Sequence, residues 1–184
     1  MGVRTERSLT GRWRVGVVAV GGNGEEGGTQ HGNGVSRPVF RGVSELLLDA
    51  KGRVAIPARH RDGLAGDGGR IVITADHGGC LLVYPQATWE PIQADLMALS
   101  SFDDRIRSVQ RLLVGHADDV ELDAAGRILV PPALRRYAGL DKRVVLVGQG
   151  QKLELWDEAK WQAQVAQTIT FAGGLPPGLQ GLSL

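Results

Sequence analysis

The chain has 184 residues, of which 42% are hydrophobic and 22% charged, so it can form one ordinary domain or two small ones and bury a core. Its net charge of +1 excludes binding to a polyanion through the overall field, and the single cysteine, Cys80, excludes an internal disulfide and suits a reduced cytoplasm. The sequence has no run of about 18 apolar residues, so no membrane span is predicted.

Residues 1–38 differ in composition from the rest of the chain. Ten of them are glycine, and they show neither helical nor alternating periodicity, so we expect a disordered leader. The stretch GGNGEEG (21–27) has the glycine spacing of a dinucleotide-binding loop. Its two glutamates would repel phosphate, however, and the residues that follow cannot continue as a helix. We therefore expect no cofactor.

The first half of the remaining chain contains short β-rich runs separated by turn signals: 43–49, 54–57, 71–75 and 80–84. Helical stretches alternate with these runs: 57–64, 86–99 and 102–115. Pro57 suits the first position of the first helix. Ser100 and Ser101 are candidate N-caps for the third helix, and Gly115 is expected at its end.

The second half repeats this series. Its β-rich runs are 120–123, 128–131, 142–148 and 152–156, and its helices are 131–139 and 157–167. LDAKGRVAIP (48–57) and LDAAGRILVP (122–131) are identical at six of ten positions, and Arg61 matches Arg135 at the same 74-residue offset. This period is longer than the roughly 20–50 residues of a solenoid repeat, so it indicates a duplicated domain.

The repeated DxxGR pattern predicts a tight connection between two strands. Asp49 and Asp123 can each bond backbone amides two residues on, while Gly52 and Gly126 can adopt the positive φ that a Cβ penalises. Each loop then ends on an arginine, Arg53 or Arg127, whose planar guanidinium suits phosphate or the edge of guanine.

Two interpretations of these arginines stay open from the residues alone: anion binding, or pairing with carboxylates in simple turns. Residues 39–184 carry 16 Lys and Arg against 17 Asp and Glu, so any nucleic-acid binding must come from a local cluster. Lys51 adds a charge to the first loop, where the second has Ala125. We therefore expect the first loop to bind more strongly.

Three stretches together resemble the MraZ family of bacterial transcriptional regulators, from Phe40 to about Gln167. They are FRGVSELLLDAKGRVAIPARHRDGL, then WEPIQADLMALSSFDDRIRSVQRLLVGHADDVELDAAGRILVPPALRRYAGL, and finally VVLVGQGQKLELWDEAKW. The most specific motifs are the doubled DxxGR, RSVQRLLVGHA and LVGQGQKLELW. Chains of this family usually begin with Met just before FRG, so we expect Val39, read from a GTG codon, to be the native start.

The resemblance implies an α+β fold of two SpoVT/AbrB-like swapped-hairpin β-barrel halves with packed helices. The expected parts are a leader (1–38), domain 1 (43–90), linking helices (91–118), domain 2 (119–162), and a helix end with a tail (163–184).

The resemblance also implies a function and a set of site residues. It implies ring-shaped homo-oligomers in the cytoplasm and nucleoid, bound to direct repeats in double-stranded DNA upstream of the division and cell-wall gene cluster, which they would repress. The family's DNA-contacting loop falls on these positions: Asp49, Lys51, Gly52 and Arg53, with Asp123, Gly126 and Arg127 in the second copy.

Two other classes of protein are compatible with parts of the sequence. An enzyme or metal site would depend on His60, His77, Cys80 and His116, but no second ligand pair accompanies the His77–Cys80 spacing and no catalytic motif is present. We expect no catalysis and no metal. An AbrB-like antitoxin or interaction module is the alternative function, although the duplication and closing helix argue against it.

Two interpretations are open for three arginines near the middle of the chain and for three of the tryptophans. Arg105, Arg107 and Arg111 could form a second phosphate-binding stripe, but a solvated or inter-subunit salt-bridging face is favoured. Trp89, Trp156 and Trp161 are expected in the core or at a subunit interface.

Overall fold

A computed structural model describes residues 38–66, 68–100 and 102–169. The predicted leader, including the 21–27 glycine pattern, and the tail beyond residue 169 lie outside these residues apart from Pro38. The strands are β1 (Phe40–Leu47), β2 (Arg53–Ala55), β3 (Arg70–Ala75), β4 (Leu81–Pro85), β5 (Asp118–Glu121), β6 (Arg127–Leu129), β7 (Arg143–Gly150) and β8 (Lys152–Asp157). The helices are α1 (Ala58–Ala65), α2 (Gln86–Ala98), α3 (Asp104–Leu113), α4 (Pro132–Ala138) and α5 (Glu158–Ile169).

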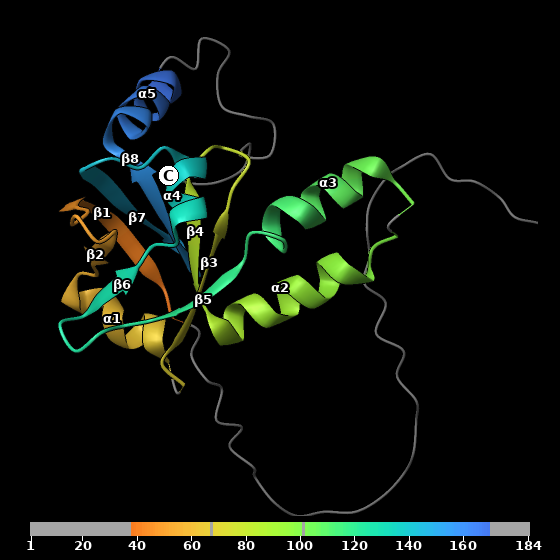
Figure 1. The fold of residues 1–184 in the computed structure, drawn as a ribbon, viewed down its shortest axis with the longest axis horizontal. Helices are drawn as coiled ribbons and strands as arrows, with labels where there is room; N and C mark the ends of the chain where they lie inside the picture. Colours follow the sequence, from red (N-terminus) through yellow and green to blue (C-terminus); the bar gives the residue numbers. More distant parts are fainter. Residues whose placement is uncertain (1–37, 67, 101, 170–184) are drawn as a thin grey trace, which may run out of the picture. The chain divides into compact units, whose positions relative to one another are not determined.

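Six strands form one antiparallel sheet in the order β1-β7-β8-β4-β3-β5, and β2 and β6 form a separate two-stranded ribbon (Figure 1). The first strand of each repeat pairs with the hairpin of the other repeat, because β1 lies on β7 and β5 lies on β3. The two repeats therefore share one sheet. The mixed α and β composition is as predicted, whereas a closed barrel within each repeat is not confirmed.

The sheet is covered on both faces, which explains the unbroken apolar runs of its central strands. One face packs with β2, β6, α1 and α4 around Ile71, Leu155 and their neighbours. The other packs against side chains from α2, α3 and α5 around Trp89 and Trp156. These two tryptophans are buried, as expected for core residues, and Trp161 is half-buried beside Trp156.

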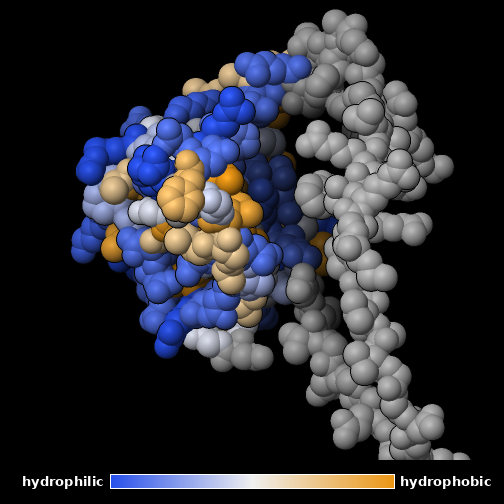
Figure 2. All heavy atoms as spheres, turned by 90° about the vertical axis from the view of Figure 1, so that its right-hand side faces the viewer, coloured by the Kyte–Doolittle hydropathy of each residue, from blue (hydrophilic) through white to orange (hydrophobic). Residues whose placement is uncertain are grey.

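Helices α2 and α3 lie side by side as an arm that projects away from the sheet (Figure 1). The Gln110 side chain joins them by donating to the Leu96 carbonyl oxygen at 2.8 Å. We call residues 86–113 the arm. Figure 2 faces its end and shows apolar side chains grouped there among hydrophilic ones. The exposed apolar residues of the arm are Met97, Leu99, Phe102 and Val109.

Two predicted helix starts are wrong. Pro57 is the N-cap and not the first helical residue, because its ψ of 137° is extended and α1 begins at Ala58. The N-cap of α3 is Asp103, whose carboxylate accepts from the Arg105 amide at 2.7 Å. Ser100 is too far upstream to cap that helix, and Ser101 lies outside the described residues.

The predicted end of α3 is nearly right. The helix ends at Leu113 with Val114 as its C-cap, and Gly115 is the next residue. A Cβ at Gly115 would lie 2.5 Å from the Arg111 carbonyl oxygen. Glycine is therefore required there by the close approach of the preceding turn.

Candidate nucleic-acid interface

The β2–β6 ribbon places both DxxGR arginines on one outward face. In the register of this ribbon, Arg53 is paired with Leu129 and Ala55 is paired with Arg127. Cross-strand partners point to the same side of a ribbon, so these four side chains share a face. The opposite side carries Val54 and Ile128, which are fully buried in the core.

The two arginines are therefore close neighbours. Arg53 and Arg127 are diagonal partners in the ribbon, with Cα atoms about 7–8 Å apart by ordinary sheet geometry. Leu129 lies beside them with 51% of its surface exposed, although it is apolar. A two-stranded ribbon of this kind fits the major groove of B-DNA, where guanidinium groups can reach guanine and an apolar side chain can contact the thymine methyl group.

Residues 49–53, here loop 1, form the turn that the sequence predicted. The Asp49 Oδ1 accepts from the backbone amides of Lys51 and Arg53, both at 2.9 Å. The Gly52 amide donates to the Asp49 carbonyl oxygen at 2.8 Å, and Gly52 has a φ of 82°. The Asx-type turn and the positive-φ glycine are both confirmed.

Residues 123–127, here loop 2, repeat this geometry. The Asp123 Oδ1 accepts from the amides of Ala125 and Arg127 at 2.9 and 3.0 Å, and Gly126 has a φ of 73°. The duplication seen in the sequence is thus a duplication of backbone shape. Two equivalent loops begin the two strands of the ribbon.

Each arginine is held by the aspartate of its own loop. The Arg53 Nε and Nη2 lie 2.8 and 2.7 Å from the Asp49 Oδ2, and Arg127 contacts Asp123 at the same two distances. The interpretation in which the arginines pair with carboxylates therefore describes this structure. The arginine side chains nevertheless stay 29% and 34% exposed, so neither is sealed inside the protein.

This pairing orients each guanidinium and leaves one edge available. Asp49 occupies Nε and Nη2 of Arg53, while Nη1 has no partner among the residues that the structure describes. A guanidinium carries five N–H donors, so the remaining donors can still bind a phosphate oxygen or a guanine acceptor. Asp49 thus closes the turn with one oxygen and positions Arg53 with the other.

The hydrogen bonds also set the charge of the loops. Bonds from the backbone amide and side chain of Arg53 lower the pKa of Asp49 to about 2, and the Arg127 side chain lowers the pKa of Asp123. A carboxyl group with a depressed pKa stabilises the fold above its ordinary value of 3.8, and this contribution is lost as pH falls through the folded pKa. Both aspartates are therefore ionised at neutral pH.

The two loops differ in net charge. In each loop the aspartate and the arginine cancel, but loop 1 also carries the exposed Lys51 where loop 2 has Ala125. Loop 1 is thus positive by one charge and loop 2 is neutral. The difference lies in the part of the site that would contact phosphate.

Two further arginines lie directly behind the loops. The Arg135 guanidinium from α4 packs against Gly52 of loop 1, and that of Arg61 from α1 packs against Gly126 of loop 2. In the sequence, these arginines are related only by their 74-residue offset, which equals the offset between Gly52 and Gly126. This equality is the signal in the sequence that links the arginines to the loops.

The candidate enzyme or metal residues do not come together as a site. His77 is almost fully exposed in the β3–β4 turn, whereas burial raises the pKa of the Cys80 thiol to about 12. His60 is buried, its pKa is lowered chiefly by burial, and its Nε2 accepts from the Arg59 Nε at 3.1 Å. The His116 ring packs on Tyr137. Within the described ranges, no three His, Cys, Asp or Glu side chains could hold a metal ion.

The arginines of α3 do not form a continuous stripe. Arg107 pairs with Asp104 on the same helix, while Arg105 and Arg111 are exposed. This pair lies within one helix, so the inter-subunit salt bridges stay a prediction. None of the helices in residues 38–66, 68–100 and 102–169 is both long and apolar enough to cross a membrane.

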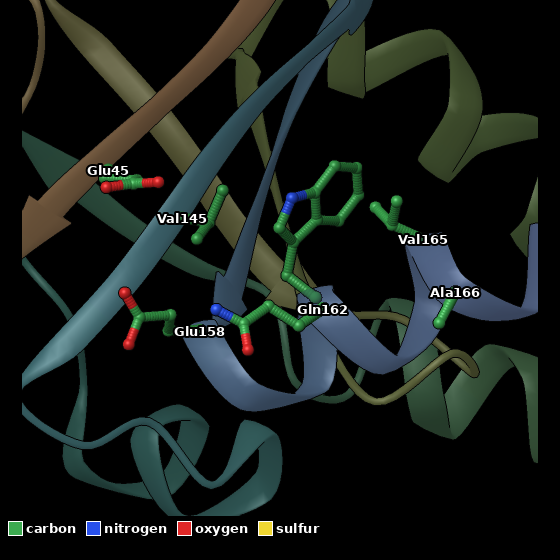
Figure 3. Close-up of a pocket in the computed structure, with 7 residues that line it drawn as sticks. Glu45, Val145, Glu158, Gln162, Val165 and Ala166 are labelled. Atoms are coloured by element: carbon green, nitrogen blue, oxygen red, sulfur yellow. The ribbon is translucent and has the colours of Figure 1, made fainter.

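A hollow of about 300 Å³ lies between α5 and the β1–β7 edge of the sheet (Figure 3). Val145 and Trp161 line its apolar part, and Glu45 and Glu158 lie at its acidic side. On β1, Val43 and Leu47 flank Glu45 and expose 53% and 63% of their surface. The hollow with these two residues is an apolar surface that the described part of the chain leaves uncovered.

The family model described as "MraZ protein" and "antitoxin-like" matches the chain twice, over residues 39–112 and 113–172. A protein named "Transcriptional regulator MraZ" from Thiobacillus denitrificans is 56% identical over 148 residues, which cover 79% of this chain and all of the relative. A relative of the same name from Nitrosospira multiformis is 55% identical over 147 residues, with the same coverage. Another, from Thioalkalivibrio sulfidiphilus, is 62% identical over 124 residues, which cover 67% of this chain and 83% of the relative.

Proposed function

Because the chain belongs to the MraZ family of transcriptional regulators, we propose that it regulates transcription by binding double-stranded DNA through loops 1 and 2. The observation that carries this proposal is the pair of oriented arginines, Arg53 and Arg127, on one exposed face of the ribbon. We further propose that the bound DNA consists of direct repeats upstream of the protein's own division and cell-wall gene cluster. Binding would repress transcription of that cluster, and the protein would lie in the cytoplasm and nucleoid.

The face of the ribbon is suited to contacts with the base edges of DNA, and the loops are suited to contacts with its phosphates. Arg53 and Arg127 would present their free guanidinium edges to guanine, and Lys51 would neutralise a phosphate. Asp49 and Asp123 would limit non-specific binding, because each carboxylate offsets the charge of its arginine and so weakens the attraction to phosphate. No cofactor takes part in this mechanism.

The exchange of β1 and β5 between the repeats supports the swapped-hairpin fold. The double match of the family model supports two copies of one domain, at 43–90 and 119–162. With two copies of one domain, one chain would present two loops where simpler relatives of the fold would need two chains.

The difference in charge between the loops gives a direct test of their proposed contacts with DNA phosphates. Lys51→Ala is expected to reduce the slope of log affinity against log salt concentration by about 0.9, the value for one phosphate contact. Ala125→Lys is expected to increase that slope by about the same amount. The measurement is fluorescence anisotropy of labelled operator DNA at several salt concentrations. An unchanged slope in both variants would contradict phosphate contact by these positions.

We propose that the protein assembles into a ring through the arm. The exposed apolar residues of the arm and the uncovered hollow beside α5 are two different surfaces of one chain. A contact between unlike surfaces is heterologous, and it closes into a ring when the rotation between subunits allows. A ring would repeat the weakly charged loops, and linked sites gain affinity from a high effective concentration.

Phe102 is the side chain that should matter most for assembly, because it is 99% exposed. Phe102→Asp is expected to convert the oligomer to monomers, since a charge would have to enter an apolar contact. Sedimentation velocity measures the change. Leu129→Asp is the matched control, because Leu129 is 51% exposed and lies on the ribbon, outside the arm and the hollow. A wild-type protein that sediments as a monomer would contradict the ring.

The family description "antitoxin-like" favours a second candidate function, binding to a protein toxin. The two functions differ in what the loops must do. A repressor that acts through its loops loses function when Arg53 is removed and the assembly is intact. An interaction module that acts through another surface retains its partner in the same variant.

A further inference from the structure

The guanidinium groups of Arg135 and Arg61 lie flat against the loop glycines of the opposite repeat. A Cβ built on Gly52 would lie 2.5 Å from the Arg135 Cζ, 2.6 Å from its Nη1 and 2.8 Å from its Nε. A Cβ built on Gly126 would collide with the same three atoms of Arg61. Both contacts are closer than a real Cβ allows, so the glycines are required for the arginines to fit.

A backbone hydrogen bond accompanies each of these contacts. The Val130 amide donates to the Gly52 carbonyl oxygen at 2.9 Å, and the Ile56 amide donates to the Gly126 carbonyl oxygen at 2.9 Å. Val130 and Arg135 belong to the second repeat, whereas Gly52 belongs to the first. Each glycine is thus fixed at its carbonyl and at its Cα by the repeat that does not contain it.

The two contacts differ in one respect. The Arg61 Nε donates to the Ile56 carbonyl oxygen at 2.7 Å, so that guanidinium is anchored within its own repeat. The Arg135 Nε is buried without a hydrogen-bond partner in the described part of the chain. A buried donor without a partner is unfavourable, so no hydrogen bond through Nε offsets the burial of this guanidinium. Its close contact is the packing on Gly52.

The Arg135 Nε is sealed from solvent, although the residue as a whole is partly exposed. Lys51 is exposed and Arg53 is partly exposed on the ribbon face, and these are the loop 1 side chains that we propose to meet DNA. The salt dependence of operator binding, given below, separates support of the loop from a direct phosphate contact by Arg135.

We propose that Arg135 and Arg61 are positioning residues that hold the DNA-contacting loop of the opposite repeat, so that the second repeat sets the geometry of loop 1 and the first sets that of loop 2. The DNA part of this inference rests on the proposed function. Its physical basis is general: a site held by a rigid supporting shell loses affinity when that shell moves by a fraction of an ångström. The proposal predicts that a substitution of Arg135 or Arg61 changes the loop of the opposite repeat and leaves the loop of its own repeat unchanged.

Amide hydrogen exchange tests the proposal without DNA. Arg135→Gln is expected to speed exchange of the Lys51, Gly52 and Arg53 amides by about tenfold or more, while the loop 2 amides keep their wild-type rates. Arg61→Gln is expected to give the opposite pattern. Arg136→Gln is the matched control, because Arg136 is the next residue on α4 and is exposed.

Arg135→Lys separates packing from charge. It keeps the positive charge but removes the planar group that lies on Gly52, so it is expected to behave like Arg135→Gln. Equal acceleration in both loops, or a lysine variant identical to wild type, would overturn the proposal. The lysine variant also keeps the test decisive if the glutamine variant fails to fold.

Operator binding supplies the second readout. Arg135→Gln is expected to weaken binding about tenfold and to be non-additive with Arg53→Ala but additive with Arg127→Ala. The salt slope should be unchanged, since a loss of about 0.9 would make Arg135 a phosphate contact and overturn the positioning role. If wild-type protein bound no operator, the proposed function would fail while the exchange pattern still decided this inference.

Discussion

Replacing Arg53 with alanine is expected to weaken operator binding by about 100-fold, or nearly 3 kcal/mol, while the fold and assembly are retained. Two effects add. The variant loses the guanidinium that we propose to contact DNA, and it leaves the Asp49 carboxylate without its partner. An unpaired carboxylate at the interface repels phosphate, and truncating one member of a charge pair typically costs about 2–5 kcal/mol of binding.

The control for this prediction is Arg70→Ala, which removes an exposed arginine from β3, outside the loops, the arm and the hollow. It should leave operator binding within about twofold of wild type, since surface substitutions usually change free energies by under 0.5 kcal/mol. The double variant Asp49→Asn with Arg53→Ala should recover part of the non-specific affinity, because asparagine removes the charge and can still accept from the turn amides. If Arg53→Ala and Arg70→Ala bind operator equally, Arg53 is not a DNA contact.

Replacing Gly52 with alanine is expected to destabilise the protein by about 2–4 kcal/mol and to lower its melting temperature by about 10 °C. One part of this cost is conformational, because Gly52 has a φ of 82°, where an alanine is strained by about 1–2 kcal/mol. The other part is steric, because the new Cβ would lie 2.5 Å from the Arg135 Cζ.

Gly150→Ala separates the two parts. Gly150 has a φ of 68°, and a Cβ built there meets nothing within 4 Å, so its substitution should cost only the conformational part, about 1–2 kcal/mol. Thermal unfolding followed by circular dichroism measures both variants. Equal losses in Gly52→Ala and Gly150→Ala would show that Arg135 moves aside at no cost.

The sequence predicts the loops well because their geometry is local. An aspartate that bonds amides two residues on and a glycine with positive φ depend on residues within one turn, and both appear in loops 1 and 2. The apolar runs of β3, β4 and β7 also follow from the sequence, since a strand buried on both faces is largely apolar.

The strand order could not be predicted from periodicity. A strand such as β1 can pair with either hairpin, and nothing in FRGVSELL indicates that its partner is β7, about 100 residues away. The same limit applies to the supporting arginines, because their contacts cross between repeats. The equal offsets of Gly52 to Gly126 and of Arg61 to Arg135 pointed to a shared role without showing which arginine meets which glycine.

The pairing of Arg53 with Asp49 was open for a different reason. An aspartate has two carboxylate oxygens, and the turn requires only one of them. Whether the second oxygen binds the arginine depends on a side-chain rotamer that the sequence does not specify. The cap of α3 shows the same effect, because Asp103 and the nearby serines are all competent caps and the backbone selects Asp103.

We propose above all that loops 1 and 2 bind the DNA upstream of the protein's own gene. Nuclease footprinting with the purified full chain on that DNA tests it most directly. We predict protection of tandem direct repeats at low protein concentration, with protection lost for Arg53→Ala at the same concentration. Uniform, sequence-independent protection, or a footprint that Arg53→Ala leaves unchanged, would contradict it.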